Sequence, residues 1–310
     1  MTSALDEAAL ARLRPELIGY CYRMLGDGAA AEDATQEILL RLWRARDRYD
    51  PRRAGLRTWA YAIATRYCID VLRAAPRRAL ATDLVDVCRP GDPFGAPLPA
   101  GGWVTPLPDD PAEIAERRDA IRLAFAAALQ RLTPRQRAVL ILRDVYGYTA
   151  AETGELLGAG TAAVHSILQR ARRALVDRSD PARDLPAAEI DPGLLAAFVT
   201  AFENHDVPAL TALLDSAVVS SMPPVAFWVA GRTDVIDLFA SGDGCRGHRL
   251  IPTTANARPA FGQYAPDGAG LRPFALLLLA SDGQRITRMT TCLDLADRFP
   301  AFGLPARLPG

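Results

Sequence analysis

Two helix-start signals of the same kind follow each other closely in the middle of the chain. Thr133-Pro-Arg-Gln136 and Thr149-Ala-Ala-Glu152 are both capping boxes, in which a threonine hydroxyl and a Gln or Glu side chain satisfy backbone amides. Gly147 ends the first helix, Gly158 ends the second, and Thr161 begins a third. A helix, a short glycine-containing turn and a second helix make a helix-turn-helix, so this spacing predicts that motif.

The helix predicted from Thr161 onward has one apolar face and one polar face. The apolar stripe consists of Val164, Ile167, Leu168, Ala171 and Leu175. The other face begins with small residues, which approach base edges, and ends with arginines, which hold phosphates. The residues predicted to contact DNA are Ala162, His165, Ser166, Gln169, Arg170, Arg172 and Arg173. The alternative is an ordinary helical hairpin whose polar face is only solvated.

The helix predicted from Ala31 to Arg46 is apolar on two sides. Its core stripe consists of Ala34, Ile38, Leu42 and Ala45. The second side carries Leu39, Leu40 and Trp43 beside the polar residues Glu32, Asp33 and Gln36. A helix with two apolar sides is either fully buried or docked on another protein, and acidic residues beside a tryptophan favour docking. We therefore predict a protein-binding surface on this helix.

The next predicted helix, Arg57 to Arg73, is rich in aromatic and basic residues. Trp59, Ile63 and Tyr67 share one face, which is predicted to be core. Thr58, Tyr61 and Thr65 lie on the opposite face. Aromatic side chains interleaved with arginines can stack unpaired bases while holding the backbone, so the second face is a candidate surface for single-stranded DNA.

Two proline-containing joints divide the chain. Prolines and glycines crowd the stretch from Arg89 to Pro111, a composition that predicts a linker rather than a packed element. A second joint runs from Ser179 to Pro186. The predicted organisation is two all-α domains at residues 1–78 and 112–178, an α+β domain at 191–310, and linkers at 79–111 and 179–190.

The C-terminal segment changes from helices to strands along its length. Helical patterns near Leu194–Asn204 and Pro208–Leu214 precede short strands. Phe274–Ala280 and Gln284–Leu293 flank Ser281-Asp-Gly283, which predicts a hairpin with an Asp-Gly turn.

The motifs of both helical segments resemble those of extracytoplasmic-function (ECF) sigma factors. Two segments resemble the second conserved region of that family: Ala31-Glu-Asp-Ala-Thr-Gln-Glu-Ile-Leu-Leu-Arg-Leu-Trp43 and Trp59-Ala-Tyr-Ala-Ile-Ala-Thr-Arg-Tyr-Cys-Ile-Asp-Val-Leu-Arg73. Two further segments resemble the fourth region: Leu132-Thr-Pro-Arg-Gln-Arg-Ala-Val-Leu-Ile-Leu-Arg143 and Val164-His-Ser-Ile-Leu-Gln-Arg-Ala-Arg-Arg173. These motifs follow one another in the family's order.

The resemblance implies a role for each predicted surface. Asp33, Gln36, Glu37, Leu40 and Trp43 would dock on the clamp of the largest subunit of RNA polymerase. The loop Asp50–Leu56 and the helix after it, with Arg57, Thr58, Tyr61 and Arg66, would open and read the −10 element of promoter DNA. The helix Thr161–Arg173 would read the −35 element. Arg66 and His165 stand where relatives commonly carry asparagine. The promoter sequence that relatives recognise therefore cannot be assigned to this chain.

The third segment resembles a SnoaL-like domain, a curved sheet with helices that form a cone, as found fused to one subgroup of ECF sigma factors. The residues that carry this likeness include Ser221-Met-Pro-Pro224, Phe227-Trp228 and Phe302-Gly-Leu-Pro305. The expected fold is thus multi-domain: two all-α sigma domains, the second a helix-turn-helix, and a C-terminal α+β cone. The resemblance implies that the cone regulates activity in cis, with or without a small-molecule ligand.

The sequence also bears on cellular location and on cofactors. No basic stretch followed by an apolar core opens the chain, and the longest apolar run, Phe274–Ala280, is far shorter than the ~20 residues of a membrane helix. The five cysteines lack metal or redox spacing, so we expect small core residues in a reducing cytoplasm. No cofactor, metal site or membrane association is expected.

Two other functions remain open. A one-component regulator would join a helix-turn-helix to a ligand-binding cone, but it would not need the docking helix or the aromatic helix. An enzyme would need an acid or base inside the cone, for which Asp215, Asp234, His205 and His248 are the candidates. We expect no catalysis.

Overall fold

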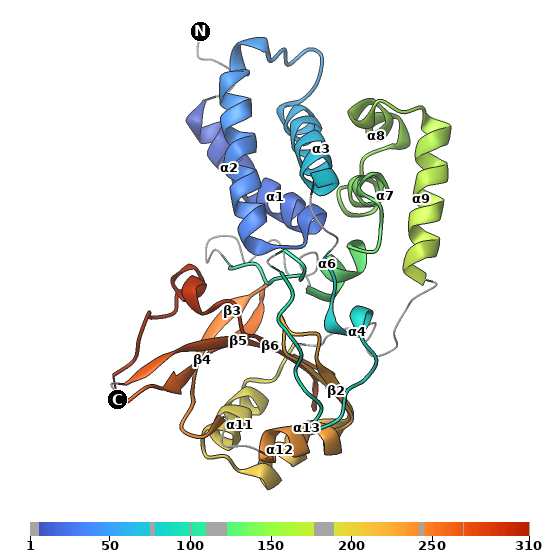
Figure 1. The fold of residues 1–310 in the computed structure, drawn as a ribbon. Coiled ribbons are helices and arrows are strands. Elements are labelled where there is room, and N and C mark those ends of the chain that lie inside the picture. The colour runs from blue at the N-terminus through green and yellow to red at the C-terminus, as the bar shows by residue number, and fades with distance from the viewer. Residues whose placement is uncertain are drawn as a thin grey trace. The chain divides into compact units, whose positions relative to one another are not determined.

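The computed structural model shows two compact units (Figure 1). It describes residues 6–74, 78–99, 101–109, 123–176, 189–241, 245–268 and 270–309. The first unit comprises residues 1–79 and 104–179, and the second comprises residues 80–103 and 180–310. The predicted helices of residues 112–122 and the predicted joint at 179–186 lie outside the described residues.

The first three helices of the first unit pack on one another. They are α1 (Glu7–Leu25), α2 (Gly28–Arg44) and α3 (Leu56–Ala74), with the short 3-10 helix η1 (Arg46–Arg48) after α2. Aspartates begin two of them, because Asp6 accepts the Ala9 amide at 2.8 Å and Asp27 accepts the Ala30 amide at 2.7 Å. Ala34, Ile38 and Leu42 are buried, as predicted for the core stripe of α2.

The remaining described helices of this unit include the predicted helix-turn-helix, formed by the helices that begin after Thr133, Thr149 and Gly160. They are α6 (Leu123–Leu129), α7 (Pro134–Leu140), the π-helical turn η2 (Ile141–Val145), α8 (Ala150–Leu157) and α9 (Thr161–Val176). Both capping boxes are present in the structure, at Thr133 with Gln136 and at Thr149 with Glu152. Gly158 has a φ of +59° where α8 ends, a backbone conformation that favours glycine.

The second unit is built on a six-stranded sheet with the strand order β2-β1-β6-β5-β4-β3. The strands are β1 (Leu214–Ser221), β2 (Trp228–Ala230), β3 (Arg249–Ala255), β4 (Arg258–Pro266), β5 (Leu271–Ser281) and β6 (Ile286–Cys292). The β1–β6 pair is parallel and the other pairs are antiparallel. The predicted hairpin is the β5–β6 pair, and Asp282 accepts the amides of Gln284 and Arg285 in its turn.

Helices pack with this sheet around a single apolar core. They are α11 (Pro192–Glu203), α12 (Val207–Leu213) and α13 (Arg232–Ala240), and the 3-10 helix η4 (Ala296–Phe302) follows β6. Phe198 of α11, Phe261 of β4 and Leu277 of β5 are all buried in this core. The structure thus has the expected fold class, with helical domains followed by an α+β cone.

The prediction for the buried face of α3 was wrong. The buried residues are Ala60, Tyr61, Ala64, Thr65 and Cys68, whereas Trp59, Ile63 and Tyr67 are half-buried. Alanine and cysteine are small, so this face allows close packing of α3 against α1. The Tyr61 ring is buried along with them.

The prediction that residues 79–111 form an unpacked linker was also wrong for the described residues. We call residues 80–103 the strap; it belongs to the second unit and includes the short helix α4 (Ala81–Leu84). Leu98 donates a backbone hydrogen bond to Pro224, and the ring of Phe94 lies 4.6 Å from that of Phe227. After the strap, Val104 and Leu107 are each only 3% exposed. Proline blocks regular helix here but not apolar or backbone contacts with a partner segment.

Candidate nucleic-acid and polymerase interfaces

The polar face of α9 is exposed as the sequence predicted. Ala162, His165, Ser166, Gln169, Arg170, Arg172 and Arg173 are all exposed. Buried Val164, Leu168 and Ala171 hold the opposite face of the helix against the first unit. This face therefore presents small residues near the helix start and arginines toward its end.

One of these arginines already has an acidic partner within the chain. Arg172 donates two hydrogen bonds to Asp144 of η2, at 3.0 Å from Nε and 2.7 Å from Nη2. The Asp144 carboxylate raises the pKa of Arg172, which therefore keeps its charge. Asp144 competes with any phosphate for this guanidinium, whereas Arg170 and Arg173 are exposed beside it.

The second side of α2 carries two large apolar side chains in solvent. Leu40 is 49% exposed and Trp43 is 42% exposed. Asp33 and Gln36 are also exposed, and Glu37 is half-buried with a 2.7 Å hydrogen bond from Arg41. An exposed leucine and tryptophan on one helix of a folded unit are typical of a protein-binding surface.

The predicted single-strand-binding residues of α3 have different environments. Arg66 is exposed. Arg57 is exposed as well, and its Nε lies 2.7 Å from a carboxylate oxygen of Glu16. Thr58 is half-buried and hydrogen-bonded to the Tyr148 side chain. Tyr61 is fully buried, so in this conformation it cannot stack a base.

Tyrosines from the turn before α8 cover Tyr61. Its ring centroid lies 4.9 Å from that of Tyr146 and 5.8 Å from that of Tyr148. Tyr20 of α1 lies 5.1 Å away in an edge-on arrangement. Burial raises the pKa of Tyr61, so its hydroxyl stays protonated. Arg23 of α1 donates a 2.8 Å hydrogen bond to the Tyr146 hydroxyl, which attaches the turn to α1.

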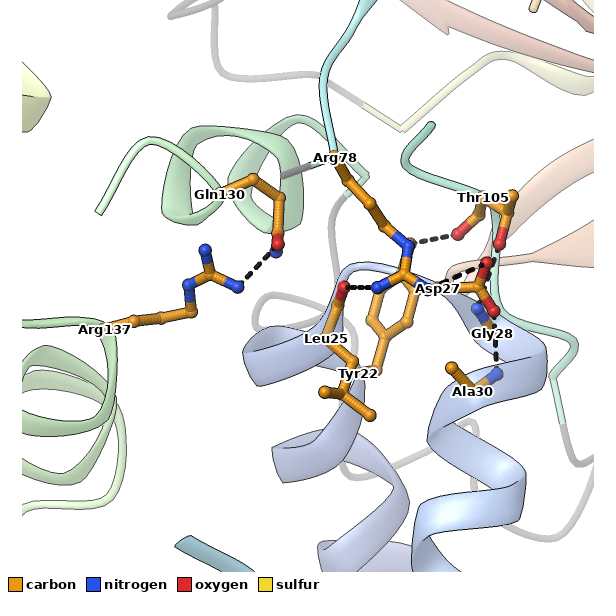
Figure 2. Close-up of polar contacts among 9 residues, drawn as sticks. All are labelled: Tyr22, Leu25, Asp27, Gly28, Ala30, Arg78, Thr105, Gln130 and Arg137. Atoms are coloured by element: carbon orange, nitrogen blue, oxygen red, sulfur yellow. Dashed lines mark hydrogen bonds and ion pairs between the residues drawn. The ribbon is translucent and has the colours of Figure 1, made fainter. Parts of the chain in front are cut away.

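At the polar junction at the end of α1, Thr105 makes three hydrogen bonds, of which Figure 2 shows the two with Gly28 and Tyr22. Its amide donates to Gly26 O at 3.1 Å, its hydroxyl accepts from the Gly28 amide at 3.1 Å, and its carbonyl accepts from the Tyr22 hydroxyl at 3.0 Å. A Cβ at Gly28 would lie 2.3 Å from Pro106 O, so only glycine allows this approach.

Two arginines complete the junction by reaching the last carbonyls of α1. Arg78 donates to Leu25 O at 2.7 Å and lies 3.7 Å from an Asp27 oxygen (Figure 2). Arg137 of α7 is 3% exposed and donates to Met24 O, Gln130 Oε1 and Leu132 O. Positive charge at a helix C-terminus is stabilising, because it satisfies orphan carbonyls and opposes the helix dipole. The junction and the tyrosine cluster together join α1–α3 to the helix-turn-helix.

Comparisons with known proteins agree with this arrangement. The family model for Sigma-70 region 2 matches residues 10–78, and the one for Sigma-70 region 4 matches residues 122–175. The ECF RNA polymerase sigma factor SigG of Mycobacterium tuberculosis is 39% identical over 314 residues, covering 95% of this chain and 82% of that one. The chain belongs to the ECF sigma factors. It therefore acts with RNA polymerase in transcription initiation.

Two further relatives of this sigma factor match most of its length. The probable ECF sigma factor SigI of M. tuberculosis is 27% identical over 286 residues, covering 89% of each chain. The crystal structure of the ECF sigma factor SigJ of M. tuberculosis has a TM-score of 0.62 and 21% identity, covering 97% of this chain and 100% of that chain. The likeness to SigJ shows that the fold continues through the C-terminal unit.

Sequence reasoning missed the residues that close the first unit of the sigma factor. Thr105, Arg137, Tyr146 and Tyr148 meet partners far away in the chain, and no local pattern marks such pairs. Gly26-Asp27-Gly28 was the one available signal, since two glycines around a cap residue indicate close backbone approach.

The four acid or base candidates in the cone lie at separate places, and three of them contact a neighbouring group. His248 is 6% exposed, and its Nδ1 is 2.8 Å from Gln263 Nε2. Burial lowers its pKa, with a further contribution from Arg272. His205 stacks on Phe239 at 4.5 Å, and Asp215 accepts the Ala217 amide. Asp234 lies in the first turn of α13.

The described residues of this unit contain no cluster of metal ligands. Among the described residues, no group of three or more His, Cys, Asp or Glu side chains could hold a metal ion. None of the helices in the described part combines the length and apolar character that a membrane crossing requires.

Proposed function

We propose that the first unit of this sigma factor is a closed state, which must open when the protein binds polymerase and promoter. Residues 1–78 would bind core polymerase through α2 and read the −10 element through α3. Residues 112–178 would read the −35 element through α9. The observation that supports the closed state is the burial of Tyr61 under Tyr146 and Tyr148.

Geometry gives a second reason for opening. Helix α3 contacts α8, and α8 contacts α9. Packed helices lie about 10 Å apart, so the axes of α3 and α9 are separated by roughly 20 Å. The −10 and −35 elements are about 25 base pairs apart, or about 85 Å along the duplex at ~3.4 Å per base pair. One closed unit cannot reach both elements.

The surface of α2 supports the docking assignment independently of opening. Leu40 and Trp43 are exposed apolar side chains beside Asp33 and Gln36, a composition that suits a protein partner better than DNA. We assign the clamp of the largest polymerase subunit as the partner, as the family resemblance implies.

The cone is proposed to regulate the first unit in cis rather than to catalyse a reaction. Asp215 of β1 and His248 before β3 are separated by four strand spacings, about 19 Å along the sheet. An acid–base pair would need both groups within reach of one substrate. The Asp215 carboxylate and the His248 ring are each used in a local hydrogen bond.

The function is tested by in vitro transcription of fragmented genomic DNA with core polymerase, with and without the purified protein. We expect new start sites that share one −10 and one −35 sequence. Identical start sites in both reactions would refute promoter-directing activity.

A further inference from the structure

The side chain of Tyr146, in region 4, occupies a slot on region 2. Its ring centroid lies 4.9 Å from that of Tyr61 on α3 and 5.9 Å from that of Tyr20 on α1. The guanidinium carbons of Arg23 and Arg57 lie 5.4 Å and 5.8 Å from the same centroid. One flat ring of region 4 is thus held by two aromatic rings and two cations of region 2. We call these four side chains, with the carbonyl oxygen of Glu16, the ring slot.

The hydroxyl of Tyr146 meets both a donor and an acceptor in the ring slot. Arg23 Nη1 donates to this hydroxyl at 2.8 Å, and the hydroxyl donates to Glu16 O at 3.4 Å. An unpaired nucleobase is also a flat ring, and its Watson–Crick edge presents donors and acceptors side by side. Tyr146 therefore shares its shape and the polarity of its edge with an unpaired base.

The walls of the ring slot are positioned by hydrogen bonds and an ion pair within region 2. The Glu16 carboxylate accepts from the Tyr61 hydroxyl at 3.4 Å and lies 2.7 Å from Arg57 Nε. The Tyr20 hydroxyl and Thr65 Oγ1 are 2.6 Å apart. These three contacts do not involve region 4, so they should persist when Tyr146 withdraws.

The chemistry of the ring slot suits DNA once Tyr146 has left. Arg23 is only 4% exposed in the closed unit, and a buried charge needs a polar partner. Aromatic rings and guanidinium planes are the groups on which proteins stack unpaired bases. Tyr61 and Arg57 also belong to α3, the helix proposed to read the −10 element. An unpaired base can therefore replace the Tyr146 ring and satisfy the same groups.

We infer that the ring slot binds one unpaired base of the −10 element, and that Tyr146 takes the place of this base in the closed unit. This inference rests on the proposed opening of the first unit and names the ligand of the surface that opening uncovers. The base stacks against Tyr61 and Tyr20, Arg23 donates to an acceptor on its edge, and Glu16 O accepts from its amino or imino group. A base and the Tyr146 ring cannot occupy the slot together, so the closed unit excludes the −10 strand.

Abasic scanning tests the ring slot in the complex with core polymerase. The complex is titrated with single strands that carry the −10 sequence shared by the start sites. Replacement of one nucleotide at a time by an abasic nucleotide removes the base and keeps the phosphates. We expect at least one position at which the abasic strand binds about tenfold more weakly, because stacking on the slot is lost there.

Arg23→Met locates that base in the ring slot. The variant removes the guanidinium that donates to the base edge, so the abasic penalty at the slot position should fall to about threefold or less. Arg12→Met changes an exposed arginine of the same helix and is the matched control. It should retain the full penalty. Circular dichroism checks that both variants are folded.

Tyr146→Ala gives a second readout that does not depend on Arg23. Without polymerase, the wild-type slot holds the Tyr146 ring, so the −10 strand should bind weakly. Tyr146→Ala vacates the slot and favours the open state, so the intact strand should bind severalfold more tightly. The strand that is abasic at the slot position should gain nothing from this substitution.

The outcomes separate this inference from the proposed function. Equal affinity for every abasic strand, a full penalty in folded Arg23→Met, or a Tyr146→Ala protein that treats intact and abasic strands alike would each overturn the ring slot. Each of these results can occur while the wild-type protein initiates normally. Failure of the wild-type protein to direct initiation would overturn the proposed function and the ring slot with it.

Discussion

The guanidinium of Arg137 makes hydrogen bonds to backbone or side-chain groups of both sigma regions. It lies in region 4, is 3% exposed, and donates to Met24 O of region 2 and to Gln130 and Leu132 of its own region. Removal of a charged donor leaves its buried acceptors without a hydrogen-bond partner. Each unsatisfied acceptor destabilises the folded state by about 1–3 kcal/mol, which is more than the hydrogen bond itself contributed.

Substitution of Arg137 should therefore weaken the closed unit. Arg137→Met keeps most of the side-chain volume and should lower the melting temperature of the first unit by roughly 5–10 °C, from a loss of about 2–3 kcal/mol. Calorimetry of the full chain measures this change. Arg170→Met, on the exposed face of α9, is the matched control. Equal melting temperatures for the two variants would contradict the role given to Arg137.

Neighbouring residues on α9 should divide recognition between bases and phosphates. Gln169→Ala should change the preferred base at one −35 position, because Gln169 lies centrally on the exposed face. Arg170→Gln should weaken binding to all sequences alike and reduce the slope of log K against log salt by about 0.9. Binding titrations on a promoter library at several salt concentrations measure both. A changed base preference for Arg170→Gln with none for Gln169→Ala would reverse the assignment.

At the scale of elements, α2 has a buried core side and an exposed side that we propose docks on polymerase. Leu40→Ala with Trp43→Ala should reduce core polymerase binding at least tenfold and leave helicity unchanged, because Leu40 is 49% exposed, Trp43 is 42% exposed and neither lies in the core. A pull-down with core polymerase and far-ultraviolet circular dichroism measure the two effects. Val176→Ala removes an even more exposed apolar group at the end of α9 and should bind normally. Normal binding by the double variant would exclude α2 as the docking element.

The elements that sequence predicted well depend on local chemistry. The helix-turn-helix was predicted from two capping boxes and a glycine. These signals join residues no more than four positions apart in the chain, so they can be recognised in the sequence. The buried face of α3 could not be predicted, because small Ala60 and Ala64 gain burial through the close approach of other helices of the unit. The strap was mistaken for a linker because its partners, residues 224–228, lie far along the chain.

At the scale of the whole molecule, we propose that the turn before α8 controls access to α3, because its tyrosines cover Tyr61. Tyr146→Ala should remove the ring that covers Tyr61 and shift the first unit toward the open state. We expect severalfold tighter binding to core polymerase, since less energy is spent on opening. Tyr146→Phe retains the ring and loses the hydroxyl bonded to Arg23, so its effect should be smaller. Unchanged affinity for Tyr146→Ala would mean that this contact does not limit opening.

The distance between region 2 and region 4 tests the closed-state account most directly. Spin labels introduced as unnatural amino acids at Asp70 of α3 and Glu155 of α8, both exposed, would leave the native cysteines in place. Pulsed electron resonance on the isolated full-length protein should give one short distance, because α3 and α8 are in contact. Addition of core polymerase and promoter DNA should lengthen it by tens of ångströms, as the ~85 Å between promoter elements requires. The same short distance in the promoter complex would contradict the account.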